Sequence, residues 1–366
     1  MKLTISRQSL LRELTRLRGV VERKNTIPIL SNVLLEAAPG ALTLRGTDLD
    51  VSVTTACEAE VARPGAACVG AKKLFEIARA LPDAPIEIAA ENWQVSVKCE
   101  RSRFKLPGLS PESYPEIPQP EGAFIALPAA LLRDFINRVS FAITQEESRY
   151  ALNGAKLEIA GGALRMVATD GHRLSLVEKR GAVSDASLTA DILIPRKALA
   201  EMAALCDGAG TVELSHAGNH VSLRSGSRTL TARLLTGQFP NYAAVLPAET
   251  PNRAVLDAAG FAAAVRRVAL MADERSQAVR LDFRADSISV AAQSAEAGEA
   301  GETVACEYAG AEATACYNAR YLSDFFGAVP EGRVIFEFRD GNSQAQLRPE
   351  DGEGCEFKMI LMPMRI

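Results

Sequence analysis

The sequence is poor in the residues that most active sites and metal centres use. Its 366 residues include three histidines and one tryptophan, and aromatic residues make up only 5%. The seven cysteines are widely spaced, and even the closest pair, Cys306 and Cys316, does not form a zinc pattern such as C-x-x-C. An odd number of cysteines without a disulfide framework is typical of reduced thiols. We therefore expect a cytoplasmic protein without a metal site.

Long apolar runs and nucleotide-binding loops are also missing. No stretch of about 18 apolar residues occurs, which argues against a membrane span. The N-terminal MKLTISRQSLLREL is charged throughout and lacks the apolar core of a signal peptide. The phosphate-binding pattern G-x-x-x-x-G-K-[ST] is absent, so we expect neither ATP nor another cofactor. The net charge of −4 argues, by itself, against a nucleic-acid binder.

Two histidines stand four residues apart in HAGNH (216–220), a spacing that a metal pair could use. Alternating apolar residues flank this stretch on both sides, and Gly218-Asn219 lies at its centre. This pattern predicts a β-hairpin with a glycine-containing tip. No third ligand is visible, so we favour the hairpin over a metal site.

The chain repeats itself at offsets between 121 and 125 positions. LLRELTRL (10–17) returns as LLRDFINR (131–138), and LTLRGTDLDVSV (42–53) returns as LRMVATDGHRLSLV (164–177). Two further pairs of segments keep nearly the same offset. Self-similarity at one fixed period is the mark of repeated structural units.

A third, fainter copy completes the chain. AAGFAAAVRRVALM (258–271) and YNARYLSDFFGAV (317–329) take the positions of the first and second helix. Clustered prolines mark the joins, so we predict three domains, at 1–120, 121–250 and 251–366. Each domain alternates helical stripes with several short strands, which predicts an α+β fold of two helices backed by antiparallel sheet.

Positive charge is concentrated on the predicted helices. Together these helices carry 14 basic and five acidic residues, a sum of +9, while the rest of the chain has 27 basic and 40 acidic residues, a sum of −13. The predicted helices span 6–20, 71–81, 129–143, 195–206, 258–271 and 318–328. Cationic faces repeated in each domain suggest contact with the phosphates of duplex DNA without reading of its bases.

An acid and a histidine stand close together in ATDGHRLSLV (168–177). A hydrolase could use Asp170 and His172, but no nucleophile motif accompanies them. The first repeat keeps the Thr-Asp pair but has Leu49 where the second has Gly171-His172, so His172 looks like an insertion peculiar to the second repeat. We favour a structural turn, because Asp and Thr side chains readily bind nearby backbone groups.

The chain as a whole resembles the DNA polymerase III beta subunit family, the processivity sliding clamps. The motifs that carry the resemblance are IPILSNVLLE (27–36), GTDLD (46–50), RYALNG (149–154), VATDGHRL (167–174), FPNY (239–242) and MPMRI (362–366). The resemblance implies three DNA-clamp domains per chain, with two chains closing a ring of six domains by two-fold symmetry. Such a homodimer would encircle double-stranded DNA and keep the replicative polymerase at its template without catalysing a reaction.

The resemblance also implies a peptide-binding pocket between the second and third domains. Polymerases, the clamp loader and repair proteins would dock there through short segments with a glutamine and large apolar residues. The implied pocket residues are Leu152, Thr169, Gly171, His172, Arg173, Leu174, Pro240, Val245, Asn318, Tyr321, Met362, Pro363 and Met364. The resemblance would place a basic residue at Ala244 and an aromatic residue at Ser276, as in some relatives. These two differences concern which peptide sequences the pocket prefers.

Two further sets of residues follow from the charge pattern and the resemblance. Candidate DNA contacts are Lys24, by family position, and Lys72, Arg79, Arg196 and Lys197, by helix charge. The resemblance implies a dimer interface in which Arg103, Phe104 and Leu106 of one chain meet Leu270 and Met271 of its partner. A repeat-built scaffold that binds only proteins is the alternative, but it leaves the helix charge pattern unexplained.

Overall fold

The computed structural model describes residues 1–21, 27–146, 148–352 and 354–365. They form two compact units, one of residues 1–133 with 197–234 and one of residues 134–196 with 235–366. The six predicted helices are all present: α1 (Arg7–Leu17), α2 (Ala71–Ala80), α3 (Ala129–Ser140), α4 (Arg196–Cys206), α5 (Ala258–Val268) and α6 (Ala319–Ala328). None of the described helices is long and apolar enough to cross a membrane.

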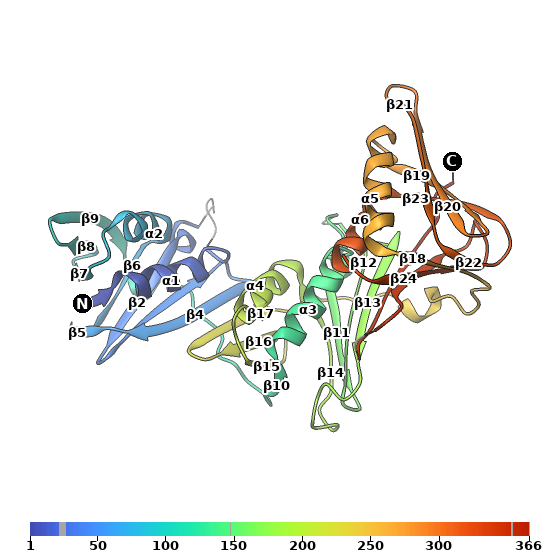
Figure 1. Ribbon diagram of the computed structural model, residues 1–366. Helices are drawn as coiled ribbons and strands as arrows, with labels where there is room; N and C mark the ends of the chain where they lie inside the picture. Colours follow the sequence, from blue (N-terminus) through green and yellow to red (C-terminus); the bar gives the residue numbers. More distant parts are fainter. Residues whose placement is uncertain (22–26, 147, 353, 366) are drawn as a thin grey trace. The chain divides into compact units, whose positions relative to one another are not determined.

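The first unit is built on one antiparallel sheet of 13 strands, in the order β10-β15-β16-β17-β4-β3-β2-β6-β9-β8-β7-β1-β5. Helices α1 and α2 pack against each other and onto its strands (Figure 1). The strands are β1 (Lys2–Ser6), β2 (Asn32–Ala38), β3 (Ala41–Thr47), β4 (Val51–Glu58), β5 (Glu60–Arg63), β6 (Gly65–Gly70), β7 (Pro85–Glu91), β8 (Gln94–Cys99), β9 (Ser102–Leu109), β10 (Ile125–Pro128), β15 (Thr211–Ala217), β16 (His220–Ser225) and β17 (Arg228–Arg233).

The second unit has a nine-stranded sheet, ordered β14-β11-β12-β13-β26-β25-β24-β18-β22, and a four-stranded sheet, ordered β21-β20-β19-β23. Helix α5 packs against α6 and against β20 and β21. The strands are β11 (Gly154–Ala160), β12 (Ala163–Thr169), β13 (Arg173–Lys179), β14 (Ala190–Pro195), β18 (Asn252–Asp257), β19 (Ala278–Arg284), β20 (Ser287–Ser294), β21 (Gly298–Ala305), β22 (Glu307–Ala309), β23 (Ala313–Asn318), β24 (Arg333–Phe338), β25 (Ala345–Pro349) and β26 (Glu356–Leu361).

Strand pairing joins successive repeats edge to edge. Strand β4 of the first repeat pairs antiparallel with β17 of the second, and β13 of the second repeat pairs in the same way with β26 of the third. Each junction therefore continues a sheet, and the second repeat contributes strands to both units. This sharing is why the two compact units do not coincide with the three sequence repeats.

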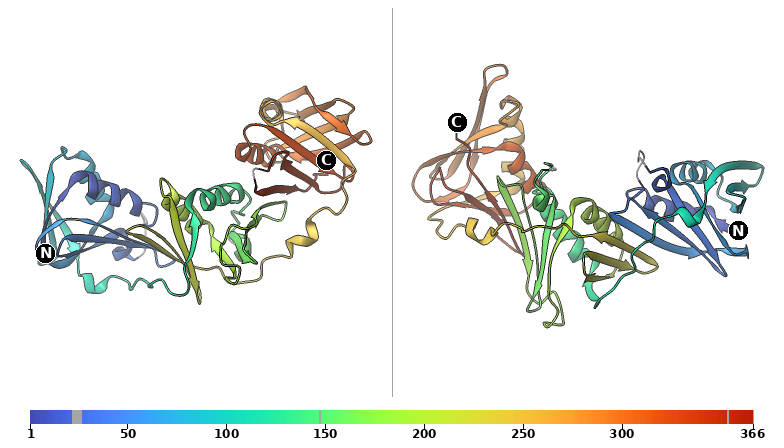
Figure 2. Two further views of the ribbon diagram at one scale, coloured as in Figure 1. Left: turned by 60° about the horizontal axis from the view of Figure 1, so that its bottom comes forward. Right: turned by 180° about the vertical axis from the view of Figure 1, so that it is seen from behind.

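Some helices are shorter than the sequence predicts, because their ends form short turns instead. Helix α5 ends at Val268, and Ala269–Met271 forms the 3₁₀ turn η5, a common way of tightening the last turn of a helix. Helix α6 begins where Asn318 accepts the backbone N–H groups of Arg320 and Tyr321. Figure 2 also shows residues 235–251, coloured yellow, which form no strand and contain one 3₁₀ turn, η4 (Tyr242–Val245).

Candidate functional site

The turn between β12 and β13 is held by its own side chains. Thr169 Oγ1 donates to the carbonyl of Arg173 at 2.6 Å and accepts the N–H of Gly171 at 3.1 Å. Asp170 Oδ1 accepts the N–H groups of His172 and Arg173 at 2.9 and 3.0 Å. The Asp170 carboxylate is therefore engaged with the backbone, as the structural interpretation of this stretch predicted, and that prediction is confirmed.

The turn between β3 and β4 repeats this arrangement residue for residue. Thr47 Oγ1 donates to the carbonyl of Val51 and accepts the N–H of Leu49. Asp48 Oδ1 accepts the N–H groups of Asp50 and Val51 at 3.0 and 2.6 Å. The repeated sequence motif thus corresponds to a repeated turn.

The sequence comparison of the two turns was wrong in one respect, because His172 is not an insertion. Leu49 occupies the position of Gly171, with φ of 82° against 89°, and Asp50 occupies the position of His172. The two turns have equal length, and the hydrogen bonds fix this pairing although the residue types differ. His172 is exposed, and its backbone N–H bonds to Asp170.

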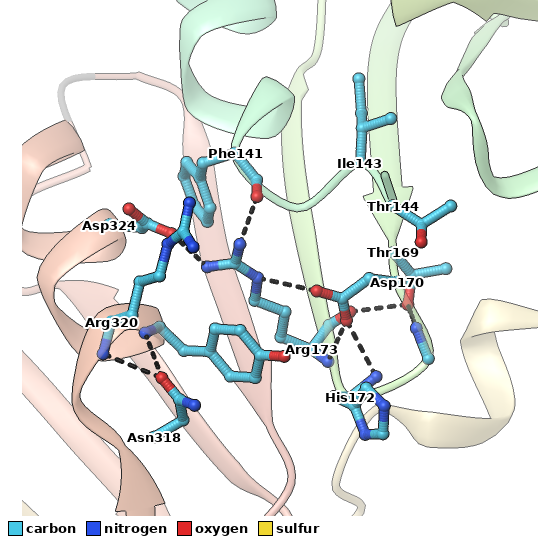
Figure 3. A network of polar contacts seen from close by, with 12 residues as sticks. Phe141, Ile143, Thr144, Thr169, Asp170, His172, Arg173, Asn318, Arg320 and Asp324 are labelled. Atoms are coloured by element: carbon cyan, nitrogen blue, oxygen red, sulfur yellow. Dashed lines mark hydrogen bonds and ion pairs between the residues drawn. The ribbon is translucent and has the colours of Figure 1, made fainter. Parts of the chain in front are cut away.

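Arg173 uses its guanidinium inside the protein. Its Nε donates to Asp170 Oδ2 at 3.1 Å, its Nη1 to Asp324 Oδ2 at 2.6 Å, and its Nη2 to the carbonyl of Phe141 (Figure 3). The guanidinium carbon lies 4.2 Å from the ring centre of Tyr321. Burial raises the pKa of Tyr321, and the Asp170 carboxylate adds to this. Arg173 therefore links β13 to α6 and to the segment that follows α3.

A cavity of about 130 Å³ opens beside this turn. Its lining contains nine residues of the implied pocket, and these come from residue 152, from residues 169–174, from residues 240–245 and from the segment after β26. The lining residues are Leu152, Thr169, Gly171, His172, Arg173, Leu174, Pro240, Asn241, Tyr242, Val245, Ile360 and Met362. Its surface is mainly apolar, because Leu174 and Ile360 belong to a buried cluster against which Leu152 and Val245 pack.

Four implied pocket residues do not line this cavity. Asn318 caps α6, and its side chain also donates to the carbonyl of Ser276 at 3.1 Å. Tyr321 lies against Arg173. Met364 donates its N–H to the carbonyl of Cys316 at 2.7 Å, and Pro363 stands just before it. These residues surround the arginine network and the chain end rather than the cavity.

Three lining residues were missed by the sequence analysis: Asn241, Tyr242 and Ile360. Ile360 has the strand parity of Met362, which was a usable signal. Tyr242 belongs to the FPNY motif, but only the fold reveals its contacts. Ala244 is exposed, and neither it nor Ser276 lines the cavity.

The candidate DNA contacts differ in the exposure of their charged groups and in their partners within the protein. Lys72 is 72% exposed and lies 3.9 Å from Glu76, and the Arg79 guanidinium stacks 5.6 Å from the ring centre of Phe75. Arg196 and Lys197 both have partners within the protein. Lys24 lies outside the described residues.

Arg196 and Lys197 have partners inside their own units. Arg196 donates to the carbonyl of Ile143 at 2.6 Å, and the Lys197 ammonium forms an ion pair with Asp48. Both charges are therefore engaged within the protein, and their contact with DNA stays a prediction.

The residues implied for the dimer interface lie on accessible segments. On β9, exposure alternates, so Phe104 and Leu106 are half-buried and Arg103 is exposed. In η5, Leu270 is 77% exposed and Met271 is half-buried. Exposed apolar side chains of this kind are typical of a surface that binds another protein.

Comparison with known proteins gives a consistent result. Models of the DNA polymerase III beta subunit match residues 1–118 (N-terminal domain), 126–241 (central domain) and 243–365 (C-terminal domain). The Caulobacter vibrioides beta sliding clamp is 37% identical, with 100% of both chains covered. The Pseudomonas aeruginosa beta subunit structure, at 36% identity and full coverage of both chains, superposes with a TM-score of 0.94.

A second solved structure of a relative contains a bound ligand. The sliding clamp of Pseudomonas aeruginosa bound to griselimycin is 35% identical, covers 100% of both chains, and has a TM-score of 0.95. The three domain models match the three repeats in order. The relatives match over the full length at more than 30% identity. The chain belongs to the DNA polymerase III beta subunit family of sliding clamps.

Proposed function

We propose that the cavity beside the 169–173 turn is the docking pocket through which this clamp holds its partners, and that the clamp itself catalyses no reaction. The observation that carries the proposal is an apolar cavity bordered by a turn whose carboxylate is used structurally. An apolar pocket with a few polar groups suits a short peptide with large apolar side chains. The relative bound to griselimycin supports a ligand-binding role in this family.

Apolar and polar residues of the pocket would contribute to peptide binding in different ways. Leu174, Val245 and Met362 offer the apolar contact, and the methionine can adapt to different side chains. Thr169 and His172 would orient the peptide at the rim. Since a few anchors usually dominate such grooves, we expect the apolar residues to contribute most of the affinity.

A peptide titration tests this proposal. A fluorescent peptide with a glutamine followed by leucine and phenylalanine is titrated with the wild type, with Met362→Ala and with Val245→Ala. Each variant should bind roughly tenfold more weakly, because it removes two or more methylene equivalents of contact. Leu49→Ala, an exposed apolar change in the first unit, serves as the control and should bind normally. Full affinity in both pocket variants would contradict the proposal.

We propose further that the helix cations contact the phosphates of encircled duplex DNA. Arg18 and Arg79 both stack on Phe75, at 4.6 and 5.6 Å, and among the described residues neither forms an ion pair with an acid. Together with Lys72 they border a cavity of about 210 Å³ between α1 and α2. Three cations outnumber Glu76, the one acid of this lining, and a surplus of positive charge is suited to backbone phosphates. Loaded clamp should slide off a linear duplex and stay on a nicked circle, and equal retention on both would contradict encirclement.

Closure of the ring would use β9 and the region of η5 in a second copy. Strand β21 forms the outer edge of its sheet and contacts η5, so the exposed Leu270 stands beside an open strand edge. Exposed Arg103 on β9 and Glu299 on β21 have opposite charges. Leu270→Ala combined with Met271→Ala should shift sedimentation toward monomer, because buried apolar area is lost at both symmetric contacts.

A further inference from the structure

One wall of the docking pocket has no sheet to hold it. Residues 240–245 supply this wall, and they lie in the strandless stretch 235–251. Within the wall, the backbone bonds are local ones, such as Ala244 N–H to the carbonyl of Asn241 at 3.2 Å. The position of this wall must therefore depend on side-chain contacts.

Tyr242 makes the polar contact that fixes this segment. Its hydroxyl donates to Glu158 Oε2 at 2.5 Å and accepts from Arg165 Nη1 at 2.9 Å. Its ring packs against the buried apolar cluster beneath the pocket and meets Phe239 edge-on at 6.4 Å. A phenol held by a carboxylate and a guanidinium makes charge-assisted hydrogen bonds, which are stronger than neutral ones.

The two partners of the hydroxyl belong to a row of charges across four strands. The sheet register sets Asp191, Glu158, Arg165 and Glu178 directly opposite one another, on β14, β11, β12 and β13 in turn. Arg165 bonds Glu178 at 2.6 Å and Glu158 at 3.2 Å. Burial alone would raise the pKa of Glu158, but the hydrogen bond from Tyr242 and those from its basic neighbours lower it.

Lys156, two residues before Glu158 on β11, adds a positive charge beside this row. Its ammonium lies 2.9 Å from Glu158 and 3.2 Å from Asp191. Because cross-strand pairs fix these side chains, the row is a rigid base on which Tyr242 can rest. Strands β12 and β13 of this row also carry the 169–173 turn, which supplies another part of the pocket lining.

We infer that Tyr242 is a positioning residue of the docking pocket: its hydroxyl fixes η4 to the charge row and so holds Pro240 and Val245 at the distance that the peptide needs. The inference rests on the proposed function of this pocket. When this wall is already ordered in the free protein, peptide binding does not include the free-energy cost of ordering it. Tyr242 thus acts on affinity through the wall.

The test is Tyr242→Phe, which removes the hydroxyl and keeps the ring. Tyr308→Phe is the matched control, since the Tyr308 hydroxyl also bonds within the second unit, to Asn252 Oδ1 and the carbonyl of Ala311, away from the pocket lining. We expect Tyr242→Phe to weaken binding of the glutamine-containing peptide roughly tenfold, as loss of a hydrogen bond to charged partners implies. The control should bind as the wild type does.

Hydrogen exchange separates positioning from general destabilisation. In Tyr242→Phe, the amides of Ala244 and Leu246 should exchange faster while the strands of the nine-stranded sheet keep their protection. In Tyr308→Phe, the amides of Ala244 and Leu246 should exchange as in the wild type. In a Glu158→Gln background, Tyr242→Phe should cost less affinity than in the wild type, because the two changes break one shared contact. Unchanged affinity and unchanged exchange in Tyr242→Phe would overturn the inference.

Failure of the docking proposal would look different. If the wild type itself does not bind the peptide, the proposed function is wrong. In that case, the exchange measurement still decides whether Tyr242 fixes η4.

Discussion

Leu49 and Gly171 occupy the same position of the same turn in two successive repeats, both with positive φ. The left-handed conformation costs a residue with a side chain roughly 1–2 kcal/mol, whereas glycine adopts it freely. Leu49 is 55% exposed, so its side chain recovers little of this cost by packing. The first repeat therefore carries backbone strain that the second avoids.

Leu49→Gly should stabilise the protein, and Gly171→Ala should destabilise it. The gain for Leu49→Gly is about 0.5–1 kcal/mol, since the greater freedom of glycine in the unfolded chain offsets part of the relief. In Gly171→Ala, the new Cβ would also come within 3.0 Å of the Arg149 guanidinium. Urea unfolding of both variants measures the changes, and equal signs for the two would show that this strain argument is wrong.

The fold was largely predictable from the sequence, since periodicity marks helix faces and strands, and the repeat gives their order. The structural role of Asp170 was also predictable, because Thr-Asp pairs favour turns wherever they occur. The equal length of the two turns could not be predicted, because Leu49 and Gly171 adopt the same backbone conformation but have dissimilar side chains. Only the hydrogen bonds establish that equivalence.

The site was less predictable, since side-chain partners come from distant parts of the chain. Lys197 lies on a cationic helix, but its ion pair with Asp48 depends on the turn of the preceding repeat. Tyr242 looked like part of a motif, and its contact with Glu158 requires the register of β11. Helical and strand patterns say which face a residue occupies, but not which charge it meets there.

Acid should weaken the first unit through Glu13. Its buried carboxylate accepts two hydrogen bonds from Arg228, one from Thr55 at 2.6 Å and one from Arg12 at 2.7 Å. Burial alone would raise the pKa of Glu13, but these bonds outweigh it and lower the pKa to about 2. Because the folded pKa is depressed, the stabilisation is complete above the ordinary value and is lost as pH falls from about 4.5 to about 2.

Glu13→Gln tests this pH dependence. At pH 7 we expect a loss of about 3 kcal/mol, since the change leaves Arg228 without its charged partner. The difference from the wild type should shrink as pH falls through that window, which urea titrations at several pH values would measure. Glu60→Gln, at an exposed position of β5, is the control. A difference that stays constant from pH 7 to pH 3 would contradict the assignment.

The buried cysteines should resist thiol reagents. Burial raises the pKa of Cys57, Cys68 and Cys206 to about 11, so at pH 8 only about one thiol in a thousand is ionised at each. Cys306, Cys316 and Cys355 are half-buried, but burial raises the pKa of the Cys306 thiol to about 11 and raises that of Cys316 as well. We expect Cys355 to react first with a disulfide reagent, while Cys57, Cys68 and Cys206 react only on unfolding, and mass spectrometry of partly labelled protein would identify the order. Early labelling of Cys68 would show that its surroundings open readily.

Arg173 should matter more for stability than its place in the pocket suggests. Arg173→Lys keeps a charge but cannot reach Asp170, Asp324 and the Phe141 carbonyl at once, because a lysine has one nitrogen in place of the guanidinium fork. We expect a loss of about 2–4 kcal/mol in urea unfolding. Arg180→Lys, whose side chain is 89% exposed, should change stability little. Equal stability of the two variants would mean that the network contributes nothing.

The chain end should matter more for peptide binding than His172 does. Met362 donates its N–H to the carbonyl of His172 at 3.0 Å, so the backbone of the turn, and not the imidazole, holds the terminal segment. His172→Ala keeps that carbonyl and should reduce peptide affinity only two- to threefold, within the range of a lost rim contact. Truncation of residues 362–366 removes the Met362 side chain from the pocket and the bond between Met364 and Cys316, and should weaken binding by at least tenfold. Titration of the fluorescent peptide compares the two variants, and sedimentation checks that each still assembles as the wild type does. A truncated protein that binds at full affinity would place the docking site elsewhere and would leave His172 without a role in binding.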